Sequence, residues 1–142
     1  MVDFVLFINA TEVSPNPLLR AAADKIDRHR ASLPMQSINH TDFPALLNVP
    51  LAVSVETKRS GQREEEADLQ IMTWQAAQWK MLRELVHDAN RGSDKMLDEL
   101  PFLPSLIVYG HEWRFAACTR EGNKKVSSCS NLFHALERPL ED

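Results

Sequence analysis

The chain has 142 residues, a formal net charge of -4 at pH 7 and 44% hydrophobic residues, a composition that suits one globular domain over residues 1–142. This composition argues against a disordered chain, and the acidic balance supplies no overall positive field for nucleic acid or an anionic membrane. Any contact with DNA must therefore be local or assisted by metal ions.

The two cysteines and the N-terminus carry little targeting information. Cys118 and Cys129 are not in a CxxC pattern, so we expect buried or unreactive thiols rather than a zinc site or a disulfide. The first residues, MVDFVLFINATEV, are apolar only briefly and include Asp3, which is not typical of a signal peptide. No run approaches the roughly 20 apolar residues of a membrane span. An intracellular location, cytoplasmic or nuclear, is the expectation.

The first third of the chain predicts a strand, a helix and a loop. Residues 2–9 are rich in β-branched and aromatic side chains and predict a strand. Residues 14–31 predict a helix, with Ser14 as N-cap, prolines at its start and apolar residues at helical spacing. The stretch 33–50 holds three prolines and predicts an ordered loop, and LAVSVETK at 51–58 predicts the second strand.

The remainder predicts a long helix and a hairpin. The helix, EADLQIMTWQAAQWKMLRELVHDAN, is closed by Gly92 and should be largely buried, because its apolar residues form two stripes. The first stripe contains Leu69, Met72, Ala76, Trp79, Leu82 and Val86, and the second contains Trp74, Ala77 and Met81. Residues 105–110 and 112–119 predict a hairpin that turns at Gly110 and His111. A short strand near Val126 and a short helix at 130–138 complete an α/β order.

The second predicted strand ends in a possible site. Its side chains alternate, so Leu51, Val53, Val55 and Thr57 form a bulky face that suits the core, while Ala52, Ser54, Glu56 and Lys58 share the other. Glu56 and the Thr57 carbonyl are oxygen ligands of the kind that Mg²⁺ or Mn²⁺ prefers, and Lys58 beside them can orient water or stabilise negative charge. The alternative is an ordinary ion pair on a solvated edge strand.

Four ordered blocks carry a resemblance to a known family: VDF in the first strand, SINHT at 37–41, LAVSVETKR at 51–59 and LQIMTWQAAQWKML at 69–82. Together they resemble the fungal proteins that carry a PD-(D/E)XK nuclease-like domain, over roughly residues 1–119. The resemblance implies a restriction-endonuclease-like mixed β-sheet flanked by helices, and metal-dependent hydrolysis of the phosphodiester bonds of DNA.

The resemblance also implies site residues. In that superfamily an Asp and the Glu of E-x-K bind Mg²⁺ or Mn²⁺, the Lys assists the attacking water, and some branches add a Gln as Q-x-x-x-Y. Asp3, Glu56 and Lys58 match this pattern, and Gln70 matches the helix element with Trp74 in place of Tyr. The literal PD is absent, and Asp3 precedes Glu56 by 53 positions, so Asp42, 14 positions before Glu56, is the rival first acid.

The superfamily fold normally begins with a helix, whereas this sequence starts at its first strand, so the expected fold lacks the usual N-terminal helix. The uncovered, apolar first strand predicts a homodimer in which the partner covers this strand or exchanges its 14–31 helix with it. The alternative is a monomer whose own 14–31 helix folds back over the strand.

Two other functions are compatible with the sequence. A repurposed nuclease-like fold would bind or transform a small molecule beside the sheet, with His40, His111, Tyr109 and Trp113 as candidate pocket residues. A noncatalytic interaction module would instead present an exposed apolar patch. Purely structural interpretations also apply to three features. His111 would be an exposed turn residue, Trp74 and Trp79 would belong to the core, and REEE at 63–66 would be a solvated helix start.

Overall fold

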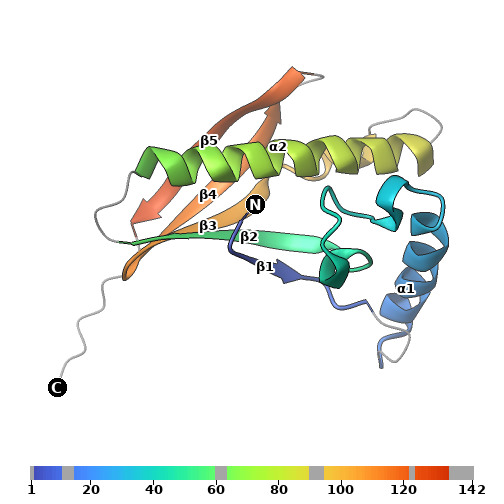
Figure 1. Ribbon diagram of the computed structural model, residues 1–142. Helices are drawn as coiled ribbons and strands as arrows, with labels where there is room; N and C mark the ends of the chain where they lie inside the picture. The colour runs from blue at the N-terminus through green and yellow to red at the C-terminus, as the bar shows by residue number, and fades with distance from the viewer. Residues whose placement is uncertain (1, 11–14, 60–63, 90–94, 122–123, 135–142) are drawn as a thin grey trace.

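A computed structural model describes residues 2–10, 15–59, 64–89, 95–121 and 124–134. Five strands and one long helix dominate it, and a shorter helix, α1, lies beyond the ends of β1 and β2 (Figure 1). The elements in chain order are β1 (Phe4–Phe7), α1 (Pro17–Arg30), η1 (Pro34–Gln36), η2 (Pro44–Leu46), β2 (Leu51–Lys58), α2 (Glu64–Ala89), α3 (Lys95–Asp98), β3 (Leu103–Tyr109), β4 (Glu112–Glu121) and β5 (Lys124–His134). The predicted α/β class and the order of the main elements are confirmed.

The strands form one mixed sheet in the order β1-β2-β3-β4-β5. β1 pairs antiparallel with β2, and β2 pairs parallel with β3, with Glu56 opposite Ile107. The parallel pair requires a crossover, which α2 supplies between β2 and β3. β3, β4 and β5 are antiparallel neighbours, and β3 turns into β4 at Gly110 and His111 as predicted. Gly110 has φ 58°, a left-handed conformation that glycine adopts without a steric penalty.

Helix α2 packs on the face of β2 that carries the smaller side chains, and not on the bulky face that the sequence favoured for the core. Gln75 of α2 donates from Nε2 to Ser105 Oγ on β3, and Gln78 donates to the Leu51 carbonyl at 3.2 Å. Small residues on the sheet therefore leave room for glutamines of the helix. The main cluster on this face contains Val2, Ala67, Ile71, Ile107, Tyr109, Ala116 and Cys118. A second cluster joins Trp79, Leu97 and Leu103.

The predicted stripes of α2 are only partly right. Trp79 is buried and Trp74 packs against the main cluster, as expected, but Leu69 is 65% exposed and Ala76 is also exposed. The buried face runs instead through Ala67, Ile71, Gln75 and Gln78. The helix is thus half-buried rather than largely buried, because part of its predicted apolar surface is exposed. Hydrogen-bonded glutamines lie on the buried face, at positions that hydrophobic periodicity assigns to solvent.

Three boundary predictions are corrected or lie outside the described residues. α1 is capped by Asn16, whose Oδ1 accepts from the Leu18 N–H at 2.9 Å, whereas Ser14 and Gly92 lie outside the described residues. The predicted helix at 130–138 is wrong as far as His134, because pairing with β4 extends β5 through that residue. Residues 135–138 are not described.

Strand β1 lies at the edge of the sheet and exposes large apolar side chains. Phe4 is 63% exposed and Leu6 57% exposed, and Phe7 and Ile8 are about half exposed. Figure 1 places α1 past the end of this strand rather than across it. The monomer alternative placed the 14–31 helix over the first strand, and this placement does not occur for the described residues 17–30.

Cys118 is fully buried on β4, as expected, but it is disulfide-bonded rather than a free thiol. Its register partner on β5 is Cys129, a cross-strand proximity that sequence spacing alone does not indicate. Among the described residues, no helix combines the length and the apolar composition that a membrane span requires.

Candidate functional site

Asp3 lies at the end of the β1–β2 pair, next to Thr57. Its backbone N–H donates to the Val55 carbonyl at 3.1 Å, which continues the pairing of the two strands. Asp3 Oδ2 accepts two hydrogen bonds from Thr57, one from Oγ1 at 2.7 Å and one from the backbone N–H at 2.8 Å. The hydroxyl bond first, and the amide bond second, lower the pKa of Asp3 below its ordinary value. The carboxylate is thus fixed in its charged form while staying exposed.

Glu56 lies on the neighbouring strand with its carboxylate turned beneath α2. It is 1% exposed, and its Oε1 lies 2.9 Å from the ammonium nitrogen of Lys58. Its Oε2 is buried and has no hydrogen-bond partner within the described residues. A buried carboxylate oxygen without a donor is costly, and oxygens left in this state often face an ion or a substrate group. Glu56 therefore offers one oxygen to a cation.

Lys58 is held by groups from a strand and a helix. Its Nζ donates to Gln70 Oε1 on α2 at 2.5 Å, in addition to its contact with Glu56. The hydrogen bond to Glu56 is the main cause that raises the pKa of Lys58, and the charges of Glu56, Asp3 and Glu66 add to it. Lys58 therefore stays an ammonium at neutral pH, and its position is set from two sides.

Glu66 is a residue of this region to which the sequence analysis gave no role. It lies one helical turn before Gln70, near enough to Lys58 for its charge to raise the lysine pKa. The signal was present in the REEE run, since Glu66 and Gln70 have helical spacing, but a charge run at a helix start is usually solvated.

Trp74 and His40 pack against each other on the α2 side of the SINHT segment. Trp74 is one turn after Gln70 on α2, and its ring meets that of His40 edge to face, with centroids 4.2 Å apart. Burial lowers the pKa of His40 to about 4, so its imidazole is neutral at pH 7. Both His40 nitrogens and Trp74 Nε1 are buried without partners within the described residues. The SINHT block thus packs on the helix that carries Gln70.

The other candidates are placed differently. Asp42 is exposed, and the described hydrogen bonds tie Asp3, rather than Asp42, to the end of β2. His111 is exposed at the hairpin turn, as expected, and Trp113 is 52% exposed. Tyr109 is buried, with the Arg114 guanidinium 4.5 Å from its ring centroid.

The oxygen atoms at this end of the sheet suit a hard cation that the protein coordinates only in part. Within the described residues, no three of His, Cys, Asp and Glu gather into a ready-made metal cage. Mg²⁺ usually binds through one or two carboxylates and keeps several waters. The unpaired Glu56 oxygen and the exposed Asp3 carboxylate fit that mode of binding.

Comparison with known proteins decides the family. A model of the PD-(D/E)XK nuclease superfamily matches residues 1–138. The chain belongs to the PD-(D/E)XK nuclease superfamily. Searches of curated proteins and of solved structures found no match.

Membership in the PD-(D/E)XK superfamily agrees with the observed mixed sheet flanked by helices. Nucleases of this superfamily generally use divalent metals. Glu56, Thr57 and Lys58, at the end of β2, have the E-x-K spacing on which the predicted site rests. The fold is therefore nuclease-like, and hydrogen bonds and an ion pair join Asp3, Glu56, Lys58 and Gln70 to the end of β2.

Proposed function

We propose that this protein hydrolyses phosphodiester bonds of DNA with Mg²⁺ or Mn²⁺, and that Asp3, Glu56, Lys58 and Gln70 form its active site within one domain. The proposal rests on the burial and the contacts of Glu56. It is a buried carboxylate with one oxygen on Lys58 and the other without a partner among the described residues. The family match supports the same chemistry.

In this proposal Asp3, Glu56 and the Thr57 carbonyl hold the metal, which supplies Lewis-acid activation when bound. Lys58 is protonated, so it donates a hydrogen bond to the attacking water or to the phosphate oxygens as negative charge develops there. Gln70 accepts from Lys58 and fixes the direction of its ammonium. Asp3 stays ionised because Thr57 donates to it twice.

The test of activity uses plasmid and oligonucleotide DNA with Mg²⁺ or Mn²⁺. We expect metal-dependent cleavage by the wild type, and a loss of at least about 100-fold in Lys58→Ala and Glu56→Gln. Lys58→Ala removes a cation at the reacting phosphate, and Glu56→Gln removes a charged ligand of the metal. Asp42→Asn is the matched control and should cleave like the wild type, whereas Asp3→Asn should not. Cleavage that is unchanged in Lys58→Ala would refute the assignment.

Calorimetric titration with metal alone separates binding from catalysis. We expect the wild type to bind Mg²⁺ or Mn²⁺ and Glu56→Ala to lose this binding, because the unpaired carboxylate oxygen is removed. Metal binding without cleavage of any DNA would keep the site but change the substrate. No binding in either protein would favour the repurposed fold, or the noncatalytic interaction module, over a nuclease.

We also propose that the protein is a homodimer in which the partner covers β1. The support is the exposure of Phe4 and Leu6 on an edge strand, since such strands pair readily with a second chain. Light scattering at micromolar concentration should give about twice the monomer mass of 16.2 kDa. Leu6→Lys should shift the protein to the monomer, while Leu69→Lys, on the exposed side of α2, should not. A wild-type mass of one chain would discard the dimer.

An intracellular location, cytoplasmic or nuclear, remains our proposal, on the composition and the N-terminal sequence. The disulfide of Cys118 argues in the other direction, since disulfides are uncommon in reducing compartments. Fluorescence microscopy of the tagged full chain decides between them.

A further inference from the structure

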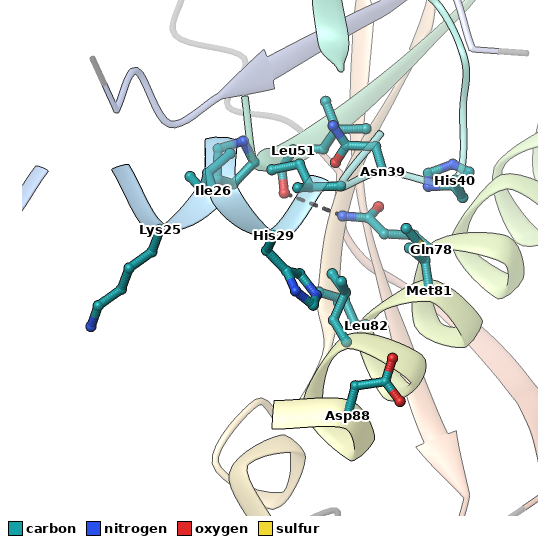
Figure 2. Close-up of a pocket in the computed structure, with 13 residues that line it drawn as sticks. Lys25, Ile26, His29, Asn39, His40, Leu51, Gln78, Met81, Leu82 and Asp88 are labelled. Atoms are coloured by element: carbon teal, nitrogen blue, oxygen red, sulfur yellow. Dashed lines mark hydrogen bonds between the residues drawn. The ribbon is translucent and has the colours of Figure 1, made fainter. Parts of the chain in front are cut away.

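A cavity lies between α1 and the second half of α2 (Figure 2). It is at the end of β2 opposite to the candidate active site. Its volume is about 490 Å³, which falls within the range of roughly 300–1,000 Å³ for small-molecule sites. Leu51, in its wall, begins β2, and Lys58 ends it. Seven steps of about 3.3 Å along a strand separate them by roughly 23 Å. The cavity therefore lies away from Lys58, and His40, which packs on Trp74, belongs both to its wall and to the region described above.

The walls of this cavity are mainly aliphatic and come from four parts of the chain. α1, the 37–40 loop, β2 and α2 each contribute apolar side chains, namely Ile26, Ile38, Leu51, Met81, Leu82 and Leu85. Such a surface gains about 25 cal/mol for each Å² of apolar ligand that it removes from water. The body of the ligand must therefore be apolar.

The polar groups at the inner side of the cavity have unused acceptors. Asn39 Nδ2 donates to the Val49 and Leu46 carbonyls, and Gln78 Nε2 donates to the Leu51 carbonyl. Both amide nitrogens are thus engaged, and within the part of the chain that the structure describes no hydrogen bond reaches Asn39 Oδ1 or Gln78 Oε1. These two amide oxygens are acceptors, so they favour a ligand that donates a hydrogen bond. His40 also lines the cavity, but its two nitrogens are fully buried and do not reach a ligand there.

The charges around the cavity are mixed. Lys25 and Asp88 carry opposite charges, and Figure 2 shows the Lys25 amine directed away from the other lining residues. The neutral His40 adds no charge at pH 7. A carboxylate or a phosphate would therefore lose its hydration without gaining a paired cation at the inner wall.

We propose that this cavity binds an uncharged, mainly apolar small molecule that carries one hydroxyl or N–H donor, which bonds to the amide oxygens of Asn39 and Gln78. The ligand class is that of phenols, long-chain alcohols and similar neutral amphiphiles. The proposal does not depend on the nuclease chemistry.

The test is a heteronuclear NMR titration of the full chain with three probes of similar shape: 2-naphthol, 2-methylnaphthalene and 2-naphthoate. We expect 2-naphthol to bind saturably and to shift the amides of residues 38–40 and 78–85. Binding should be about 3- to 10-fold tighter than that of 2-methylnaphthalene, the usual value of one hydrogen bond. The anion 2-naphthoate should bind more weakly than 2-naphthol.

Two variants locate the site. Leu85→Trp fills the cavity and should abolish binding, whereas Leu69→Trp adds the same side chain to the exposed side of the same helix and should not. If Leu85→Trp loses its dispersed spectrum, Met81→Phe replaces it as the filling variant, with the same control.

Four results would overturn the proposal: no saturable binding of 2-naphthol, equal or tighter binding of 2-naphthoate, shifts confined to the exposed residues of β1, or unchanged binding in the filling variant. Metal titration of the same samples gives an independent readout, so failure of the proposed nuclease and failure of this cavity remain distinguishable.

Discussion

At the scale of single residues, Thr57 controls the ionisation of Asp3 through two different donors. In Thr57→Val the hydroxyl donor is lost and the backbone N–H remains, so we expect the pKa of Asp3 to rise toward its ordinary value. An NMR pH titration of the Asp3 carboxyl carbon measures this change. Thr57→Ser keeps the hydroxyl and should keep the low pKa. An Asp3 pKa that does not move in Thr57→Val would show that the hydroxyl bond contributes nothing.

His40 is a residue whose burial makes stability depend on pH. Its pKa of about 4 in the folded chain is below the ordinary value of 6.5, so the unfolded chain binds more protons between these two values. The stabilising contribution is present above about pH 6.5 and is lost as the pH falls toward 4. The loss cannot exceed roughly 3.5 kcal/mol and should be smaller, because the ring is only partly buried.

Replacement of His40 by phenylalanine isolates this contribution. Urea unfolding of the wild type and of His40→Phe at pH 7 and pH 4.5 should show a smaller loss of unfolding free energy in the variant, since its ring has no proton to bind. The contact with Trp74 should persist because the new ring has a similar shape. Equal losses in both proteins would assign the acid sensitivity to other groups.

At the scale of elements, α1 depends on its cap because few contacts hold it elsewhere. Of its 14 residues only Ala23 is buried, and Asn16 accepts from the Leu18 N–H in the first turn. We expect Asn16→Ala to cost about 1 kcal/mol of unfolding free energy and Asn16→Ser to cost much less, since serine keeps an acceptor at the cap. Chemical denaturation measures both variants. Equal stabilities would mean that the cap does not contribute to the global fold.

The same elements show how far sequence patterns reach. Alternation along β2 correctly predicts that Glu56 and Lys58 share a face, because the period of a strand is strict. The buried face of α2 was only partly predicted. Gln75 and Gln78 lie on it because they bond to Ser105 and Leu51, groups about 30 residues away along the chain. The Thr57 bonds to Asp3 were missed for the same reason, because the two residues are 54 positions apart. The hydrogen-bond partner of a buried polar group depends on the tertiary structure, which local sequence patterns do not reveal.

At the scale of the whole molecule, the disulfide of Cys118 is the covalent constraint on the sheet. We expect the unfolded, unreduced protein to show no reactive thiol in a colorimetric thiol assay, and the reduced protein to show two, since the chain has two cysteines. Reduction should lower the unfolding free energy by about 2–4 kcal/mol, the usual range for a disulfide. Thiols that react before reduction would contradict the bond and would agree with a reducing compartment.

The order in which the sheet assembles follows from the positions of its strand partners along the chain. β3, β4 and β5 are consecutive neighbours, whereas each partner of β2 is remote: Val55 pairs with Phe4, and Glu56 with Ile107, both 51 positions away. Closing long loops costs entropy before any contact repays it, so the local strands should pair first and β2 last. Pulsed hydrogen exchange during refolding should therefore protect the amides of β3 and β4 before those of β2. The chain would thus acquire most of its sheet before Glu56 and Lys58 reach Asp3, and changes at that end should accelerate unfolding while leaving the refolding rate almost unchanged.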